Sequence, residues 1–405
     1  MLGTGSGRRA TVTDTLRTAE ILVTFGGMFL VGLLADLLGR HSPLPRVTLL
    51  LVAGFLIGPS VLDWLPHFTA DWFPLLTDVA LAMIGFLLGQ KLTLPALHEL
   101  GRPVLAISAG ETILTTVLVF TVLALFGVPL IVALLLGGIA PATAPAATLD
   151  VVHEAGAKGK FTDTLLGIVT IDDAWGLVIF SVLLALAESI SGHSGAGAVL
   201  ATGAWEIGGA LLLGLALGLP MAYITGRINP GEPSLAEALG IVLLCAGLAV
   251  WAEVSYILAS IALGTVVANT AKHHEQPFHE IEGIEWPFLI LFFLLAGAAL
   301  HVEAMAQVGL LGAGYIILRI VGLNLGARLG GWLSDTDSAT RNSIGLALLP
   351  QAGVAIGMAL LASQRFPEFE NIILPTVLGT TVFFEIFGPP VTRRVLIRMG
   401  QVKKD

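Results

Sequence analysis

Residues Leu134–Leu149 read LLLGGIAPATAPAATL, an apolar run that two prolines interrupt. Pro141 and Pro145 each lack a backbone N–H and clash with the preceding helical turn, so the pair predicts an unwound segment inside a helix. A second stretch, Leu346–Leu360, reads LALLPQAGVAIGMAL and carries Pro350 among glycines. Within a bilayer, unwound backbone is tolerated only where it lines a cavity or is packed in protein. The two stretches therefore predict two broken membrane helices.

The rest of the chain is equally apolar. Of its 405 residues, 55% are hydrophobic and 12% are charged, and the mean hydropathy is +0.89. This charged share is about half that of soluble domains, and disordered chains are far less apolar. Continuous apolar runs also differ from the alternating pattern of membrane β-barrels. We therefore predict an all-α polytopic membrane protein. The single cysteine, Cys245, excludes an intrachain disulfide, and the net charge of −9 gives no sign of a nucleic-acid partner.

Apolar runs of about 20 residues, the length that crosses a bilayer, predict about 13 transmembrane helices. They cover residues 19–39, 46–62, 72–90, 103–126, 130–152, 161–188, 202–225, 235–251, 254–270, 280–301, 306–333, 341–363 and 370–396. With the N-terminus outside, fifteen of the 20 Lys and Arg residues fall on the cytoplasmic side and four on the outside, and Arg319 lies within a span. Because positive charge concentrates on the cytoplasmic side, we expect the N-terminus outside and the C-terminus inside.

The two broken stretches fall in the fifth and twelfth of these spans. Two six-helix halves joined by one linking helix put both breaks at the fifth position of their half. An even-numbered half followed by one linking helix also turns the second half upside down. Inverted repeats with interrupted helices at matching positions are typical of secondary transporters, whose binding site lies at the breaks. We therefore predict two inverted six-helix repeats with crossing broken helices.

Five ionisable residues deep inside spans are singled out here, because a charge costs about 2.5–3.5 kcal/mol or more at the bilayer centre. Asp172 and Asp173 are adjacent in the sixth span, Arg319 lies in the eleventh, and the lone acids Glu111 and Glu385 lie in the fourth and thirteenth. Two adjacent carboxylates in a low dielectric do not both stay ionised without compensation. One of them can therefore exchange a proton for a small cation that prefers oxygen ligands.

The sequence TAPAATLDVVHEAG at residues 143–156, followed by TIDDAWGL at 170–177, resembles the sodium/proton antiporters of the cation:proton antiporter superfamily. Within it, the chain is most similar to the NapA-like bacterial branch that carries an aspartate pair. The resemblance covers about residues 20–396. It implies the NhaA/NapA-like antiporter fold, with thirteen helices, an outside N-terminus, a dimerisation domain and a core domain that moves as an elevator.

The resemblance also assigns roles to residues. Asp173 matches the family's essential cation- and proton-binding aspartate, Asp172 matches its neighbour, and Thr143 matches the threonine of the first broken helix. Asp173 and Asp172 are thus the expected ligands of the transported Na+.

Two positions depart from the family's pattern. Arg319 stands where electrogenic members have a lysine that pairs with the first aspartate. Because arginine does not readily give up a proton, we expect a fixed, charge-compensating salt bridge between Arg319 and Asp172, and the stoichiometry stays open. Gln351 follows the proline where many relatives read PRGE. We treat Gln351, Glu111 and Glu385 as possible accessory residues.

The family comparison also divides the chain. We expect an N-terminal extracytoplasmic segment, a transmembrane antiporter domain and a cytoplasmic tail, at residues 1–18, 19–396 and 397–405. We expect the dimerisation side at about 19–90 and 235–301, the core side at about 103–188 and 306–396, and the linking helix at about 202–225.

The sequence therefore predicts a secondary active transporter rather than an enzyme. We expect it to exchange a monovalent cation, Na+ first and K+ or Li+ next, for protons by elevator-type alternating access, as a homodimer in the inner (plasma) membrane that serves pH homeostasis. No cofactor is expected. ATP is not expected to drive transport, because no GKS or GKT phosphate-binding sequence occurs. Two alternatives are K+/H+ antiport and sodium-coupled organic-anion symport on the same architecture, although the aspartate pair disfavours an anion.

Overall fold

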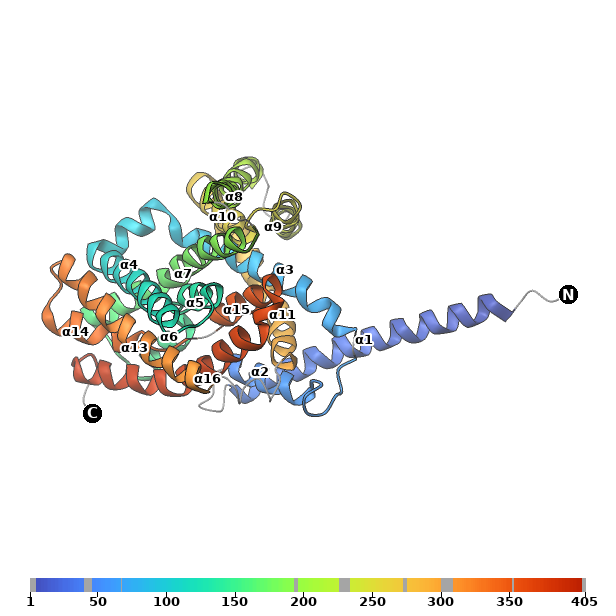
Figure 1. Cartoon of the computed structure of the whole chain (residues 1–405), viewed down its shortest axis with the longest axis horizontal. Coiled ribbons are helices and arrows are strands. Elements are labelled where there is room, and N and C mark those ends of the chain that lie inside the picture. Colours follow the sequence, from blue (N-terminus) through green and yellow to red (C-terminus); the bar gives the residue numbers. More distant parts are fainter. Residues whose placement is uncertain are drawn as a thin grey trace. The chain divides into compact units, whose positions relative to one another are not determined.

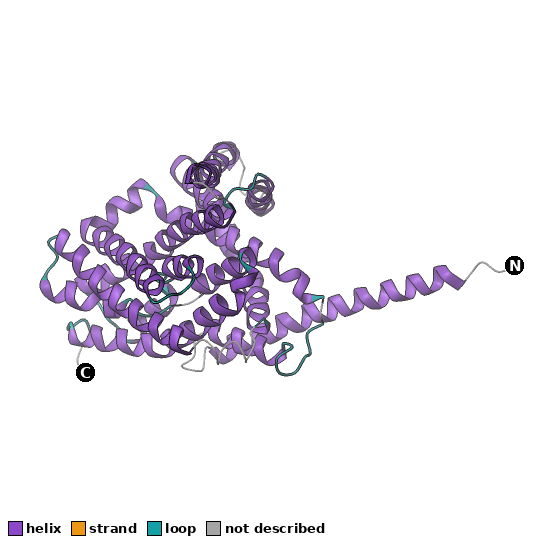
Figure 2. Cartoon of the chain, in the orientation of Figure 1, coloured by secondary structure: helices purple, strands orange, loops and turns teal. Residues whose placement is uncertain are grey.

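The computed structural model describes residues 5–39, 46–66, 68–192, 196–225, 234–271, 275–299, 309–351 and 353–402. Within these ranges the regular structure is helical and no strand occurs (Figure 2). This confirms the predicted all-α class.

The helices follow the predicted spans in order, and each span coincides with one helix or with a pair of half-helices (Figure 1). They are α1 (Gly5–Gly39), α2 (Arg46–Ile57), α3 (Thr69–Gly89), η1 (Gln90–Leu92), α4 (Leu94–Leu125), α5 (Leu130–Ile139), α6 (Pro145–Glu154), α7 (Lys160–Gly192), α8 (Ala196–Thr225), α9 (Ser234–Trp251), α10 (Tyr256–Thr270), α11 (Glu275–Ala298), α13 (Gly309–Leu333), α14 (Ser338–Ala347), α15 (Gly353–Arg365), η2 (Pro367–Phe369) and α16 (Glu370–Arg398). Residues 300–308, where the tenth predicted span ends and the eleventh begins, lie outside the described ranges.

Eight helices of the described part are long and apolar enough to cross a membrane unbroken. The other predicted spans are shorter helices or are divided by the breaks, so they do not meet that length. α1 begins at Gly5, well before the predicted span, because residues 5–18 contain no proline that would stop the helix.

Both predicted breaks are present. α5 ends at Ile139 and α6 begins at Pro145, and α14 ends at Ala347 and α15 begins at Gly353. Asp337 caps the start of α14, where its carboxylate accepts a 2.9 Å hydrogen bond from the backbone N–H of Thr340. Hydrogen bonds from Thr340 lower the pKa of Asp337, so this cap contributes fully above the usual aspartate pKa and is lost as the pH falls through the lowered value.

Contacts divide the chain into two units, each described here by itself. The first comprises Met1–Leu76 and Trp286–Leu300, and the second comprises Thr77–Glu285 and His301–Asp405. In the first unit, α2 packs closely on α11 at Gly54. A Cβ added at Gly54 would lie only 2.0 Å from the carbonyl oxygen of Leu294, so the two backbones are in contact there. Such small-residue contacts are how membrane helices approach one another.

The second unit contains the broken helices, and a stripe of glycines on α13 sets the position of α4 within it. A Cβ added at Gly326 would lie 2.4 Å from the Cα of Glu111, and one added at Gly330 would lie 2.0 Å from the carbonyl oxygen of Ala106. The two backbones are therefore in direct contact. This packing fixes one face of α4 against the helix that carries Arg319.

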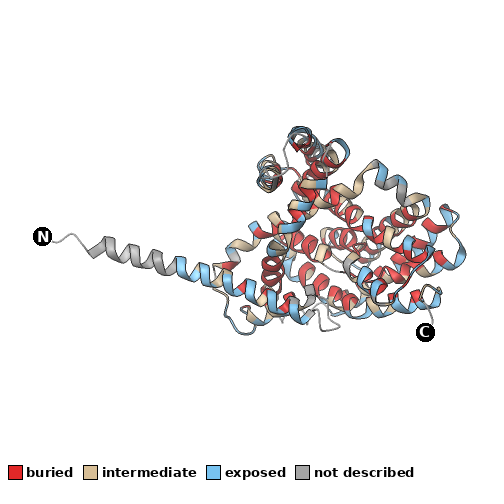
Figure 3. Ribbon diagram, turned by 180° about the vertical axis from the view of Figure 1, so that it is seen from behind, coloured by how far each residue is buried: buried red, intermediate tan, exposed pale blue. Residues whose placement is uncertain are grey.

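The helices of this unit bury one face and expose an apolar opposite face, as the alternation of colours along them shows (Figure 3). Phe161, Leu165 and Ile168 of α7 belong to a buried cluster shared with α4, α6, α13, α14 and α16. On the other face, large apolar side chains such as Ile317 and Trp332 remain exposed. An apolar outer surface is expected of helices that face lipid.

The glycine stripe makes a testable prediction. Gly326→Ala should lower the free energy of unfolding by about 1–3 kcal/mol, because the added methyl meets backbone that has no space to move. Gly314→Ala on the same helix meets nothing within 4 Å, so it should be neutral or stabilising by up to about 1 kcal/mol. Thermal denaturation of the purified protein in detergent measures both. Equal stability of the two variants would show that the stripe does not set the spacing of α4 and α13.

Candidate functional site

Arg319 of α13 joins the two breaks. It is fully buried, and its Nε and Nη2 donate hydrogen bonds to the carbonyl oxygens of Ala140 and Ala142 at 2.7 and 2.8 Å. Its Nη1 donates to the carbonyl oxygen of Leu349 at 2.8 Å, and its guanidinium lies 4.2 Å from the centre of the Phe384 ring. One side chain of α13 (labelled in Figure 1) thus binds both unwound segments. The two predicted breaks therefore meet at Arg319.

The physical reason lies in the breaks themselves. A helix that stops leaves its last carbonyl groups without partners, and its C-terminal end carries a partial negative charge. α5 and α14 both stop inside the protein, and a guanidinium offers five N–H donors in a planar fork. The carbonyl groups of Ala140, Ala142 and Leu349 therefore receive the donors that buried backbone requires.

The expected salt bridge between Arg319 and Asp172 is wrong. The three hydrogen bonds of Arg319 go to backbone carbonyl groups, and in the described part of the chain no ion pair links it to Asp172. The expectation considered only the charges of side chains. It left out the backbone carbonyl groups that the breaks leave without partners, and these accept the hydrogen bonds of Arg319. Arg319 still acts electrostatically on Asp172 and on Glu111.

Asp172 is held from α4 instead. The Ser108 hydroxyl donates to Asp172 Oδ1, and the carboxyl group of Glu111 also lies against Asp172. Glu111 is fully buried, and its Oε1 accepts a 2.8 Å hydrogen bond from the Thr112 hydroxyl. The sequence did not single out Ser108, although its position three residues before Glu111 puts both on one face of a helix.

Asp173 is buried, with an exposed fraction of 6%, and its Oδ1 has no hydrogen-bond partner. Asp172 Oδ2 and the Thr143 hydroxyl likewise make no hydrogen bond of normal geometry, although the Thr143 side chain faces Asp172 from the first break. The cation that acts on Asp173 is Lys91 of η1. The predicted span ends at residue 90, and nothing in the sequence singled out Lys91, because its effect on Asp173 depends on how η1 meets α7.

The other two possible accessory residues, Gln351 and Glu385, lie in different surroundings. Gln351 is fully buried in the second break, and its Nε2 lies 3.4 Å from the carbonyl oxygen of Ile139, which ends α5. Glu385 of α16 is buried with neither carboxyl oxygen hydrogen-bonded. No contact described for Glu385 brings it to the aspartate pair.

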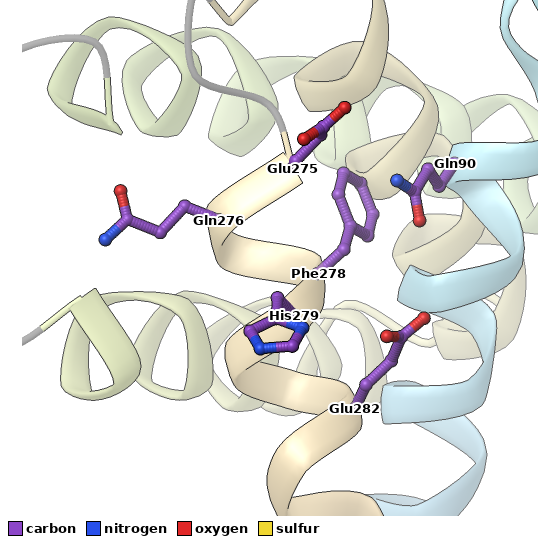
Figure 4. Close-up of a pocket in the computed structure, with 6 residues that line it drawn as sticks. All are labelled: Gln90, Glu275, Gln276, Phe278, His279 and Glu282. Atoms are coloured by element: carbon purple, nitrogen blue, oxygen red, sulfur yellow. The ribbon is translucent and has the colours of Figure 1, made fainter.

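A polar cavity of about 470 Å³ lies next to Lys91 in sequence, where Gln90 of η1 meets the first turns of α11 (Figure 4). Its other lining residues are Glu275, Gln276, Phe278, His279 and Glu282. Lys91 acts electrostatically both on Glu285, just beyond this cavity on α11, and on Asp173.

Residues 11–398 match the family described as sodium/hydrogen exchanger, transmembrane. The chain belongs to this exchanger family. Among curated relatives, the exchanger is 21% identical to the ammonium/H+ antiporter subunit AmhT of Alkalihalophilus pseudofirmus, over 92% of this chain and 94% of the relative. It is 24% identical to the Na+/H+–K+ antiporter GerN of Bacillus cereus, over 87% of this chain and 91% of the relative.

Solved structures show the same fold. The sodium/proton antiporter MjNhaP1 of Methanocaldococcus jannaschii aligns with a TM-score of 0.70 at 20% identity, over 93% of this chain and 96% of that one. The antiporter fold of the exchanger is thereby established.

The geometry around Arg319 makes a second prediction. Arg319→Lys should lower the free energy of unfolding by roughly 3 kcal/mol or more, because one ammonium group cannot satisfy three carbonyl groups in two breaks. Arg328→Lys, on the exposed face of the same helix, is the matched control and should leave stability unchanged. Thermal denaturation in detergent compares them. If Arg319→Lys is as stable as the unchanged protein, charge rather than geometry is what the site requires.

Proposed function

We propose that Asp173, with Asp172 and Thr143, forms the site at which this monovalent cation/proton antiporter exchanges a cation for protons. The observation that carries the proposal is that three buried oxygen atoms, Asp173 Oδ1, Asp172 Oδ2 and Thr143 Oγ1, make no hydrogen bond of normal geometry, while the Thr143 and Asp172 side chains face each other. Buried polar atoms in proteins are nearly always paired. Unpaired oxygens beside an unwound segment are what a transported cation would complete.

The chemistry suits a hard monovalent cation. Such ions take carboxylate, hydroxyl and carbonyl oxygens as ligands. Asp173 supplies the negative charge with the least competition, because no hydrogen bond to Oδ1 restrains it. Protonation of that carboxylate removes the charge and hence the cation's strongest ligand. Cation and proton therefore compete for Asp173, and this competition is the basis of antiport.

Asp172 has a different role in this proposal. The Ser108 hydroxyl and the neighbouring Glu111 carboxyl restrain it, so it orients the site and contributes its second oxygen. Two carboxyl groups in contact inside a protein share a proton more readily than they hold two charges. The Asp172–Glu111 pair thus keeps the charge at the site low, a task that the expected salt bridge with Arg319 does not perform.

Arg319 remains protonated throughout the cycle, because it is engaged by three carbonyl groups and arginine does not deprotonate in proteins. It is therefore not a carried-proton site. This leaves the acids Asp173, Asp172 and Glu111 to set how many protons move per cation.

Na+ is the cation we propose first, on the strength of the family. The names of two relatives add K+ and ammonium as candidates. Membership of an exchanger family favours antiport over the alternative of sodium-coupled anion symport, as does the acidic character of the site.

The transport cycle is part of the same proposal. The core side would move against the dimerisation side as an elevator, and the protein would act as a homodimer. It would lie in the inner (plasma) membrane with its N-terminus outside and its C-terminus in the cytoplasm. The inward bias of Lys and Arg supports this orientation. The hydrogen bonds of Arg319 support a core that moves as one body, because the same side chain holds the backbone of both breaks.

Substitution of Asp173 tests the site. Asp173→Asn should abolish cation-dependent proton flux, since the amide neither binds the cation by charge nor carries the proton. Asp163→Asn, an exposed acid on the same helix, is the matched control and should transport normally. Proteoliposomes with a pH-sensitive dye and added Na+, Li+ or K+ give the measurement. Near-normal flux in the Asp173 variant would place the exchange site elsewhere.

The Thr143 hydroxyl gives a graded test. Thr143→Val keeps the shape and removes one oxygen, so it should raise the KM for the cation several-fold with less effect on the maximal rate. Thr170→Val, whose exposed hydroxyl bonds only its own helix, should leave the KM unchanged. An unchanged KM in Thr143→Val would remove the hydroxyl from the ligand set.

A further inference from the structure

Glu385, near the middle of α16, is an acid that the proposed exchange site does not use. Its side chain is buried, with an exposed fraction of 2%, and neither carboxyl oxygen has a hydrogen-bond partner among the described residues. The next two residues of the helix, Ile386 and Phe387, are exposed on the apolar outer surface. The carboxyl group therefore lies on the inward side of a membrane helix, where an unpaired charge is costly.

Glu385 belongs to a stripe along one face of α16 that lies against the second break. Glu385, Gly388 and Thr392 recur at helical spacing, so they share that face. The Thr392 hydroxyl donates a 3.0 Å hydrogen bond to the carbonyl oxygen of Ala347, the last residue of α14. One turn earlier, a Cβ added at Gly388 would lie 2.8 Å from the Cα of Pro350. The contacts thus move from α14 through the break toward α15, which also packs on α16, and Glu385 lies level with the first turn of α15.

A second polar group without a partner lies on the same stripe. The Thr381 hydroxyl is fully buried and unpaired, and it precedes Glu385 by four residues, a spacing at which side chains of one helix meet. Other threonines of α16 differ, because the hydroxyls of Thr376, Thr380 and Thr392 each donate to a carbonyl oxygen one turn earlier. The Thr381 hydroxyl is therefore available to Glu385, whose side chain leans toward the start of the helix.

In the described part of the chain, no cation is placed to pair with Glu385. The elements packed against α16 are α5, α6, α13, α14, α15 and η2. Of their described ionisable side chains only Arg319 is buried, and its three hydrogen bonds go to the backbone of the two breaks. The others are exposed or half-buried: Asp150, His153, Arg328, Arg341, Arg365 and Glu368. A carboxylate at Glu385 would thus be buried without a counter-ion.

We propose that Glu385 is a second proton-binding site, separate from the aspartate pair, which holds its proton while α16 is packed over the second break. In the neutral acid the carboxyl group has an O–H donor, for which the Thr381 hydroxyl is the acceptor, and no charge is buried. Loss of the proton to water leaves an unpaired carboxylate, which is costly at this depth. The start of α15 carries a partial positive charge, so the carboxylate is reached at alkaline pH and the proton is exchangeable.

The position of Glu385 gives this proton a consequence for transport, a step that rests on the proposed function. α16 supports Arg319 through the ring of Phe384, the residue before Glu385, and contacts the second break through Gly388 and Thr392. A charge at Glu385 therefore loosens the helix that supports both the arginine and the break. Exchange requires the neutral acid, and it declines when the pH rises far enough to remove the proton.

Infrared spectroscopy of the purified full-length protein tests the proton directly and needs no transport. The protonated carboxyl band of buried acids should contain a component that is absent from Glu385→Gln. Glu370→Gln, which changes an exposed acid at the start of α16, is the control and should keep this component. Identical spectra of Glu385→Gln and the unchanged protein would overturn the proposal. So would loss of the component on addition of Na+ at constant pH, which would assign these oxygens to a cation.

The Thr381 hydroxyl gives a second infrared test that leaves the acid in place. Thr381→Val should move the Glu385 component to higher frequency, because the carboxyl group loses its hydrogen bond. Thr380→Val is the matched control, since the Thr380 hydroxyl bonds only to its own helix, and it should leave the frequency unchanged. An unmoved component in Thr381→Val would show that the proton is not held between these two residues.

A transport measurement tests the effect of the proton on the break. Sodium exchange is followed in proteoliposomes at saturating Na+ and equal pH on both sides, where proton competition at Asp173 is least. The unchanged protein and Glu370→Gln should lose exchange at alkaline pH, whereas Glu385→Gln, which mimics the neutral acid, should keep it. Identical pH profiles of Glu385→Gln and the unchanged protein would show that the proton does not support the break. If the unchanged protein exchanges nothing at any pH, the proposed function fails, and the infrared result still decides the proton site.

Discussion

The hydrogen bonds from Arg319 to the two broken helices are the constraint on which the rest of the site depends. Unwound backbone inside a membrane protein is costly unless its polar groups find partners. A single guanidinium supplies them at Ala140, Ala142 and Leu349, with an aromatic ring beneath it. Because the arginine belongs to a third helix, α13, it also ties both breaks to that helix.

The neighbouring packing serves this arrangement. The glycine stripe of α13 brings α4 into backbone contact, and α4 carries the serine and glutamate that restrain Asp172. Asp173, next in sequence, points about 100° away on the helix and so escapes those contacts. One carboxylate is therefore held and the other is left with an unpaired oxygen. Because Asp172 is held in place and Asp173 has an unpaired oxygen, exchange of a cation for a proton at Asp173 is chemically reasonable.

Much of this fold could be predicted from sequence, because bilayer-length apolar runs and mid-span prolines report directly on backbone conformation. The two breaks and the burial of Asp172, Asp173 and Arg319 followed from that reasoning. The partner of Arg319 did not, because orphaned carbonyl groups leave no trace in residue identity. Ser108 and Lys91 were missed for a related reason: their roles depend on tertiary packing between α4, η1 and α7.

An experimental structure of the antiporter with its cation bound, solved in both inward-open and outward-open states, tests the central claim most directly. The account predicts that Arg319 keeps its bonds to the carbonyl groups of both breaks in each state, while the cation lies among oxygens of Asp173, Asp172 and Thr143. A guanidinium that leaves the carbonyl groups to pair with Asp172 or Asp173 in either state would contradict it.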